Sequence, residues 1–110
     1  MKLWIDDVRP APEGYVLCKC VDNALLAIEI CQSKNDDLEI SLDHDAGDYA
    51  KFGGDFIEIL DTLEEASEEF DYWKEYIKNK ITFLILSMNP VGVENMRRII
   101  QKNGWKEDNK

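Results

Sequence analysis

Blocks of hydrophobic and polar positions alternate along the chain, and they predict four strands and three helical stretches. The strand-forming runs cover residues 3–5, 15–21, 39–43 and 81–86. Three of these runs lead into acidic or small polar residues, which are Asp6-Asp7, Asp43-His44-Asp45 and Ser87-Met88-Asn89. If the runs are parallel strands, these residues lie along one edge of the sheet, where open α/β sheets bind ligands.

Apolar positions at helical spacing predict helices between the strands. Asp22 is expected to cap a helix from Asn23 to Ser33. Asn89 is expected to cap a second helix that starts at Pro90. A longer helical stretch with a solvated acidic face lies between them.

This order of elements predicts an α/β fold, a three-layer sandwich with a mostly parallel sheet of four to five strands. The first crossover is too short for a helix, and Pro10, Pro12 and Gly14 predict a loop there. One domain is expected over residues 1–105, in which Trp105 folds back onto the core. Residues 106–110 are expected to fray.

The composition narrows the range of partners. With 13 basic and 23 acidic residues, the chain carries a net charge of −10, which repels a phosphate backbone and argues against non-specific binding to long nucleic acids. No apolar run approaches the roughly 20 residues of a membrane span, and no signal-peptide h-region is present, so a cytoplasmic location is expected. The three cysteines are expected to be buried thiols in a reducing compartment.

The strand-end acids predict a metal site. Asp6, Asp7 and Asp43 offer oxygen ligands only, which suit Mg²⁺ or Mn²⁺. The alternative is that these acids only cap loops and helix N-termini. A second acidic strand end at the same edge favours the metal, because several close carboxylates are costly without a cation.

Two further side chains suit phosphate chemistry. Arg9 is held extended before Pro10, and its planar fork fits a phosphate oxygen pair. A salt bridge from Arg9 to Asp7, Asp45 or Asp48 is the alternative. His44 could act as general acid or base or as a metal ligand. Strand alternation instead directs it away from Asp43, which favours a structural role.

The remaining candidates form the far wall of the expected crevice. Ser87 could donate to a phosphoryl oxygen or cap the local backbone, and Asn89 could contact the ligand in addition to capping its helix. Asp45 and Asp55 are second-tier candidates. Asp55 follows Gly53-Gly54 at the start of a helix, where backbone N–H groups could face an anion or be capped locally.

These motifs resemble the receiver superfamily, and within it the cyclic-phosphate processing receiver domains. The resemblance covers Met1 to about Gln101 and rests on three motifs in order, Asp6-Asp7-Val8-Arg9, Leu42-Asp43-His44-Asp45 and Ser87-Met88-Asn89-Pro90. It implies a receiver- or flavodoxin-like fold in which the paired acids bind metal, the strand-three Asp accepts phosphate and the Ser contacts it. Two features depart from the pattern: Leu86 occupies a position that resembles a histidine site in relatives, and the receiver's strand-five lysine is missing.

The resemblance implies a metal-dependent phosphate-handling domain that processes cyclic phosphates, either on a nucleotide or at a 2′,3′-cyclic RNA end. As an enzyme, it would be a metal-dependent cyclic phosphodiesterase or phosphohydrolase with Asp43, His44, Arg9 and Ser87 in catalytic roles. The alternative is an atypical, non-catalytic receiver module that binds metal or phosphate and acts through protein partners. A third reading treats the acid cluster as a relic in a scaffold protein.

Overall fold

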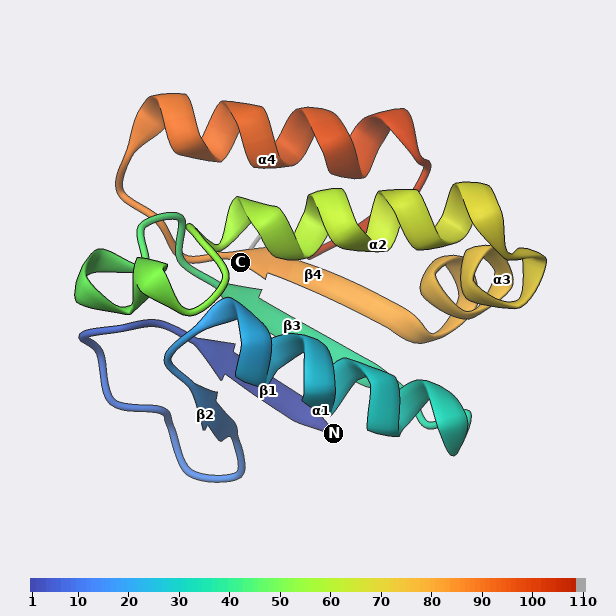
Figure 1. Cartoon of the computed structure of the whole chain (residues 1–110), viewed down its shortest axis with the longest axis horizontal. Helices are drawn as coiled ribbons and strands as arrows, with labels where there is room; N and C mark the ends of the chain where they lie inside the picture. Colours follow the sequence, from blue (N-terminus) through green and yellow to red (C-terminus); the bar gives the residue numbers. More distant parts are fainter. Residues whose placement is uncertain (109–110) are drawn as a thin grey trace.

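The computed structural model describes residues 1–108, which form one parallel sheet with its helices (Figure 1). The strand order is β2-β1-β3-β4-β5, and every neighbouring pair is parallel. The strands are β1 (Lys2–Ile5), β2 (Val16–Cys18), β3 (Leu38–Leu42), β4 (Ile81–Ile85) and β5 (Lys106–Glu107). The predicted α/β class and parallel sheet are confirmed. The strand expected at 15–21 is shorter, because the following helix begins earlier than predicted.

The helices lie between the strands in sequence. They are α1 (Val21–Ser33), the short 3-10 helix η1 (Gly47–Lys51), α2 (Ile57–Glu69), α3 (Asp71–Lys80) and α4 (Pro90–Lys102). The long helical stretch is divided at Phe70, whose backbone is extended (φ −128°, ψ 121°). Asp22 does not cap α1 as expected: Cys20 holds the N-cap position without a side-chain hydrogen bond, and Asp22 lies in the first turn.

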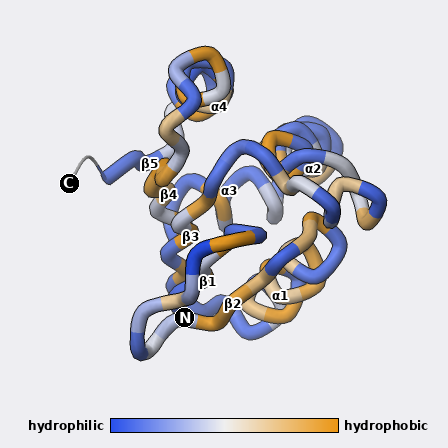
Figure 2. Tube along the Cα trace, turned by 90° about the vertical axis from the view of Figure 1, so that its left-hand side faces the viewer, coloured by the Kyte–Doolittle hydropathy of each residue, from blue (hydrophilic) through white to orange (hydrophobic). Residues whose placement is uncertain are grey.

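One face of the sheet carries the apolar core. Leu3, Ile40 and Phe83 lie opposite one another in register, and all three are fully buried. Figure 2 shows α1 and α2 together on one side of the strands, and α2 also contacts α4. The alternation of strand side chains therefore fixes which residues face the helices.

The opposite face of the sheet is covered differently. Trp4, Glu39 and Leu84 alternate with the core residues and are only partly buried. Tyr15 packs edge-on against Trp4 at 5.6 Å and donates from its hydroxyl to Glu39. Within residues 1–108, the two faces of the sheet are therefore covered unequally. The predicted loop replaces the first crossover helix, and the described part of the chain contains no helix after β5.

The C-terminal residues pair with the sheet rather than fraying at residue 106. Thr82 lies in register with Lys106, and the Asp108 backbone N–H donates to the Phe83 carbonyl. Trp105 is buried and stacks on Phe83 with ring centroids 5.4 Å apart, which confirms the expected contact with the core. Burying this ring holds the final strand in place. The last two residues of the expected tail, 109–110, lie outside the described residues.

Candidate metal and phosphate site

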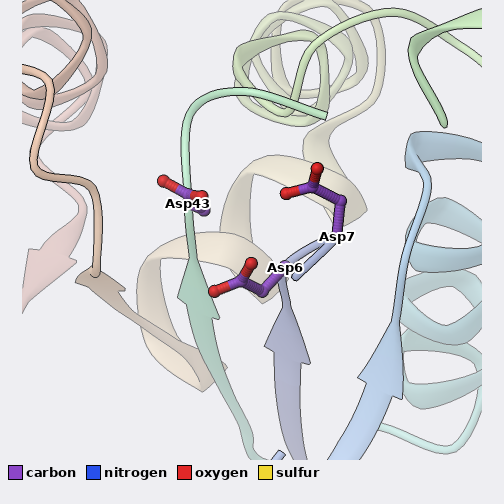
Figure 3. Close-up of side chains that lie close together, drawn as sticks. All are labelled: Asp6, Asp7 and Asp43. Carbon is purple, nitrogen blue, oxygen red and sulfur yellow. The ribbon is translucent and has the colours of Figure 1, made fainter. Parts of the chain in front are cut away.

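Three acids meet at the carboxyl edge of the sheet. Asp6 and Asp7 follow β1 and Asp43 follows β3, and Figure 3 shows their side chains beyond the ends of these strands. One carboxylate oxygen from each acid lies within 4.8 Å of the other two. The parallel pairing of β1 with β3 brings them together, and a hydrogen bond from the Asp43 N–H to the Ile5 carbonyl (2.9 Å) continues that pairing past the strand ends.

Asp6 is the most buried of the three, with 1% of its surface exposed. Its Oδ1 accepts hydrogen bonds from the backbone N–H groups of Val8 (3.0 Å) and Arg9 (3.2 Å). Its Oδ2 is buried without a hydrogen-bond partner among the described residues. A buried polar atom that lacks a partner costs free energy, so this oxygen is suited to a ligand that supplies positive charge.

The electrostatics at Asp7 also favour a cation. Burial raises the pKa of the Asp7 carboxyl above its ordinary value. A backbone hydrogen bond at Asp7 lowers this pKa, whereas the charges of Asp6, Asp43 and Asp45 raise it. The like charges thus oppose the ionised form of Asp7, and a bound divalent cation would reverse that effect.

The acids fit a small hard cation. Opposite ligands of Mg²⁺ lie roughly 4.2 Å apart, because each oxygen is about 2.1 Å from the ion. The 4.8 Å spread of the three carboxylate oxygens is close to that separation. Asp6, Asp7 and Asp43 would each offer one oxygen to a shared ion. Mn²⁺ accepts the same oxygen donors.

Arg9 connects the end of β1 with the residue that follows β4. Its Nη1 lies 3.5 Å from Asp6 Oδ2 and donates to the Leu86 carbonyl at 3.0 Å. Leu86 follows β4 and donates its own N–H to the Leu42 carbonyl. The ion pair is therefore made with Asp6, and not with any of the acids named as alternatives from the sequence. Within residues 1–108, Nη2 and Nε of Arg9 make no other hydrogen bond, so they can meet a phosphate.

The loop after β3 directs His44 away from the three acids. Its backbone N–H donates to Asp43 Oδ1 (2.8 Å), and its Nδ1 lies 2.8 Å from Asp45 Oδ1. Its ring lies against Gly92 in the first turn of α4, so close that an added Cβ would be 2.5 Å from the ring. His44 is not a member of the metal cluster found among the described residues. This placement agrees with strand alternation.

The second-tier and far-wall residues have clear local partners. Asp55 Oδ1 accepts from the Ala46 N–H (3.1 Å), which holds the loop that follows β3. Ser87 Oγ accepts from the Asn89 N–H (3.1 Å), and Asn89 Oδ1 accepts from the Gly92 N–H (3.2 Å). Asn89 is thus the N-cap of α4, as predicted, with Pro90 at the start of the helix. The Ser87 hydrogen and the Asn89 amide nitrogen are left for a ligand.

Two glycines at the site were not singled out from the sequence. Gly47 (φ +57°) lies so close to Asp7 that an added Cβ would overlap Asp7 Oδ2. Gly92 has the close approach to His44 described above. For Gly47, the sequence did offer a signal: a glycine shortly after an acidic strand end is typical of a turn with positive φ. Neither contact partner could be identified from spacing alone.

The fold and the acid cluster together define a receiver-like α/β domain with a candidate cation site at its carboxyl edge. The family model that matches the chain is described as the cyclic-phosphate processing Receiver domain, and the match covers residues 1–102. The chain therefore belongs to this family. Searches of curated proteins and of solved structures gave no match. Among residues 1–108, none of the helices has both the length and the apolar character needed to cross a bilayer.

Proposed function

We propose that the chain is a metal-dependent enzyme that hydrolyses a cyclic phosphate, on a nucleotide or at an RNA end that carries a 2′,3′-cyclic phosphate. In this reaction, water adds to phosphorus and one of the two P–O bonds of the ring breaks. The products are a phosphomonoester and a free hydroxyl, and no oxidant or second substrate is required. The membership in the cyclic-phosphate processing family supports the reaction class.

The observation that carries the proposal is the Asp6 carboxylate. It is buried, its Oδ2 has no hydrogen-bond partner among the described residues, and it lies with Asp7 and Asp43 in one cluster. These acids would hold Mg²⁺ or Mn²⁺, which when bound polarises a phosphate oxygen and lowers the pKa of a coordinated water. Such a cation would also offset the like charge that raises the pKa of Asp7.

Arg9 and Ser87 would hold the phosphate oxygens. The contacts of Nη1 with Asp6 and Leu86 fix the guanidinium across the crevice, so that Nη2 can donate to an oxygen of the substrate. Ser87 accepts from the Asn89 N–H, which leaves its own hydrogen to donate to a second phosphate oxygen. The amide nitrogen of Asn89 adds a third donor on the same wall.

His44 would carry a proton. When neutral, its Nδ1–H donates to Asp45, so that Nε2 is the acceptor. Asp43 would bind the cation and would also contact the reacting phosphate. In this scheme His44→Gln lowers turnover of a cyclic phosphate while the affinity for Mn²⁺ stays unchanged, because the imidazole is not among the three metal ligands.

The second candidate function is a binding module that acts through protein partners. Leu86 supplies no imidazole after β4, which favours this reading over catalysis. Phosphoryl signalling of the ordinary receiver type is disfavoured. Lys106, the lysine of β5, donates to the Asn79 carbonyl just before β4, at the edge of the sheet opposite the acids. It therefore cannot contact a phosphoryl group on Asp43.

The test is hydrolysis of nucleoside 2′,3′-cyclic phosphates by the purified chain with Mn²⁺ or Mg²⁺, followed by ³¹P NMR. We expect metal-dependent conversion to a monoester that Asp7→Asn abolishes. Asp37→Asn is the matched control, because this exposed acid lies at the opposite edge of the sheet and pairs only weakly with Lys80 at 3.6 Å. Absence of turnover on any cyclic phosphate, with a mass adduct on Asp43 after acetyl phosphate treatment, would favour the binding module instead.

A further inference from the structure

A second hollow lies beside the acids, between the end of β2, the start of α1 and η1. Its volume is about 560 Å³, within the usual range for small-molecule sites. The side chains that line it include Leu17, Lys19, Asp22, Asn23, Tyr49 and Phe52. None of these residues takes part in the site described above.

Two aromatic rings form one wall of this hollow. Tyr49 lies in η1, and Phe52 follows three residues later at the end of that helix. Side chains three residues apart nearly eclipse one another in a 3-10 helix, so both rings reach the same side. Phe52 is 45% exposed, and the ammonium of Lys51 lies 5.2 Å from the centre of its ring. The ammonium of Lys19 lies 5.8 Å from the centre of the Tyr49 ring.

Two other lining residues, Asp22 and Asn23, are polar and able to form hydrogen bonds. Asn23 carries both an amide donor and a carbonyl acceptor, and Asp22 carries two acceptor oxygens. An anionic group is a poor occupant here, because Asp22 repels it. A purely apolar group is also a poor occupant, because it would bury these polar side chains without partners. A flat group with an apolar face and a polar edge can stack on the aromatic rings and form hydrogen bonds with the polar side chains.

Backbone contacts connect the elements that surround the hollow. The Asp22 N–H donates to the Phe52 carbonyl at 3.2 Å, which ties the start of α1 to the end of η1. Gly53, at φ +113°, lies so close to this helix that an added Cβ would be 2.8 Å from both Asp22 Oδ1 and Val21 Cβ. The aromatic rings are therefore held by the same backbone that bounds the polar side chains.

The hollow also adjoins the acid cluster. Gly47, the first residue of η1, contacts Asp7, and Tyr49 follows two residues later. A 3-10 helix rises about 2 Å per residue, so this is an advance of only about 4 Å along the backbone. At the other side, the Asp6 N–H donates to the Cys18 carbonyl, which joins the acids to the end of β2. The hollow and the acid cluster are thus connected through η1 on one side and the end of β2 on the other.

We propose that this hollow binds the nucleobase of the substrate, with the base stacked on Phe52 and Tyr49 and its polar edge at Asn23 and Asp22. This inference rests on the proposed function, because it places the cyclic phosphate at Asp6, Asp7 and Asp43. The substrate class is then a nucleoside cyclic phosphate, and a cyclic phosphate without a base is a poor ligand. Lys19 would lie near the sugar and reduce the local negative charge.

The experiment compares a nucleoside 2′,3′-cyclic phosphate with glycerol 1,2-cyclic phosphate, which carries no base. Both are titrated into the full chain with Mg²⁺ and followed by NMR chemical shifts and turnover. Because a base gains affinity by stacking on an aromatic ring, Phe52→Ala should weaken nucleotide binding about tenfold. The same substitution should leave the glycerol ester unchanged. Tyr72→Ala is the matched control, because this exposed ring lies in α3.

The outcomes separate the two proposals. Equal binding of the two esters, with no effect of Phe52→Ala or Tyr49→Ala, would overturn the nucleobase site and leave the proposed function standing. If neither ester binds or turns over, the proposed function fails. A titration with a nucleoside alone then decides the nucleobase site: shifts at Asn23, Tyr49 and Phe52 support it, and their absence overturns it. Circular dichroism and melting confirm that each variant folds.

Discussion

At the scale of single residues, the central feature is an acid whose environment is incomplete. Asp6 satisfies Oδ1 with two backbone N–H groups, but Oδ2 has only the Arg9 guanidinium at 3.5 Å, a longer separation than a hydrogen bond. Most buried side-chain polar atoms in folded proteins have a hydrogen-bond partner. Because Oδ2 has no hydrogen bond and only this longer ion pair, it suits a role as a ligand in the proposed cation site.

Asp7→Asn separates repulsion from metal binding. Without metal, the variant should melt at a higher temperature than the original chain, because one of three like charges is removed from a partly buried cluster. With Mn²⁺ at a hundred times its Kd, the original chain should gain about 2.7 kcal/mol, and the variant should gain almost nothing. Differential scanning fluorimetry with and without Mn²⁺ measures both effects. A variant that retains the full Mn²⁺ shift would exclude Asp7 as a ligand.

Gly47→Ala tests the close approach of Gly47 to the Asp7 side chain. The new Cβ would overlap Asp7 Oδ2, and the positive φ adds strain of about 1 kcal/mol for a residue other than glycine. We expect weaker Mn²⁺ binding by isothermal titration calorimetry, together with a small loss of stability. Gly14→Ala is the control, because it also has a positive φ (+87°) but nothing within 4 Å. Equal effects of the two substitutions on Mn²⁺ affinity would contradict the contact.

The acids of the site could be predicted at this scale, and their partners could not. Asp6, Asp7 and Asp43 follow from the rule that parallel strands end at one edge. The ion pair of Arg9 with Asp6 depends on the path of the loop after β1, which no periodicity encodes. The sequence therefore suggested Asp7, Asp45 or Asp48 as the salt-bridge partner of Arg9, and not Asp6. The contacts of Gly47 and Gly92 join residues far apart in the sequence, so no local pattern predicts them.

At the scale of elements, α4 positions the far wall of the crevice. Its first turn carries the Asn89 cap, and Arg97 in its middle forms a bidentate pair with Glu107 of β5, at 2.7 to 3.0 Å. Ser87 lies in the short link between β4 and this helix. The orientation of the Ser87 hydroxyl therefore depends on how the helix begins.

Asn89→Ala removes the cap of α4. Loss of an N-cap side chain costs about 1 kcal/mol, which for a domain of about 100 residues lowers the melting temperature by roughly 4–8 °C. Asn89→Ser should recover most of this stability, since serine also accepts from the helix N–H groups. Thermal denaturation of the three proteins measures the difference. If alanine and serine are equally destabilising, the side chain does not act as a cap.

The starts of α4 and α1 differ in how well the sequence predicts them. Asn89-Pro90 combines two independent signals, and the structure confirms the predicted start of α4. Asp22 offered a single signal, and α1 begins two residues earlier than predicted, at Val21, with Cys20 as an unassisted N-cap. Here the bond from the Asp22 N–H to the Phe52 carbonyl competes with local capping. A tertiary contact of this kind overrides local preference.

At the scale of the whole molecule, the core lies between the sheet and one set of helices. Cys18 and Tyr76 contribute ionisable groups to it, and the Tyr76 hydroxyl donates to the Asp36 carbonyl at 2.7 Å. Burial raises the pKa of the Cys18 thiol to about 11 and that of Tyr76 to about 12. Each group therefore stays protonated in the folded chain at a pH where the unfolded chain has already lost the proton.

Stability should consequently fall as the pH rises from about 9 to 12. The ordinary pKa values are 9.0 for the thiol and 10.0 for the phenol, so the folded state binds more protons than the unfolded state above these values. Below pH 9 these two groups contribute no pH dependence. Tyr76→Phe should flatten the upper part of the decline, as measured by melting in a reducing buffer. An unchanged alkaline profile in this variant would contradict the assignment to Tyr76.

The sheet could be predicted at this scale, and the uneven covering of its two faces could not. Parallel order follows from the βαβ alternation, and the short first crossover already predicted a loop. The polar character of Glu39 and Ser41 was the available sign that one face of β3 has no helix over it. The contribution of Lys106 and Glu107 as a fifth strand depends on Trp105, whose burial could be expected but whose consequence for the tail could not.

The most direct test of the account is a crystal structure of the chain soaked with Mn²⁺, with anomalous scattering used to locate the ion. The account predicts one strong peak at the carboxyl edge of the sheet, coordinated by one oxygen each of Asp6, Asp7 and Asp43, with Asp6 Oδ2 as a ligand. The peak should be absent in Asp7→Asn. Mn²⁺ bound elsewhere with the three acids left free, or no bound Mn²⁺ at all, would contradict the central claim.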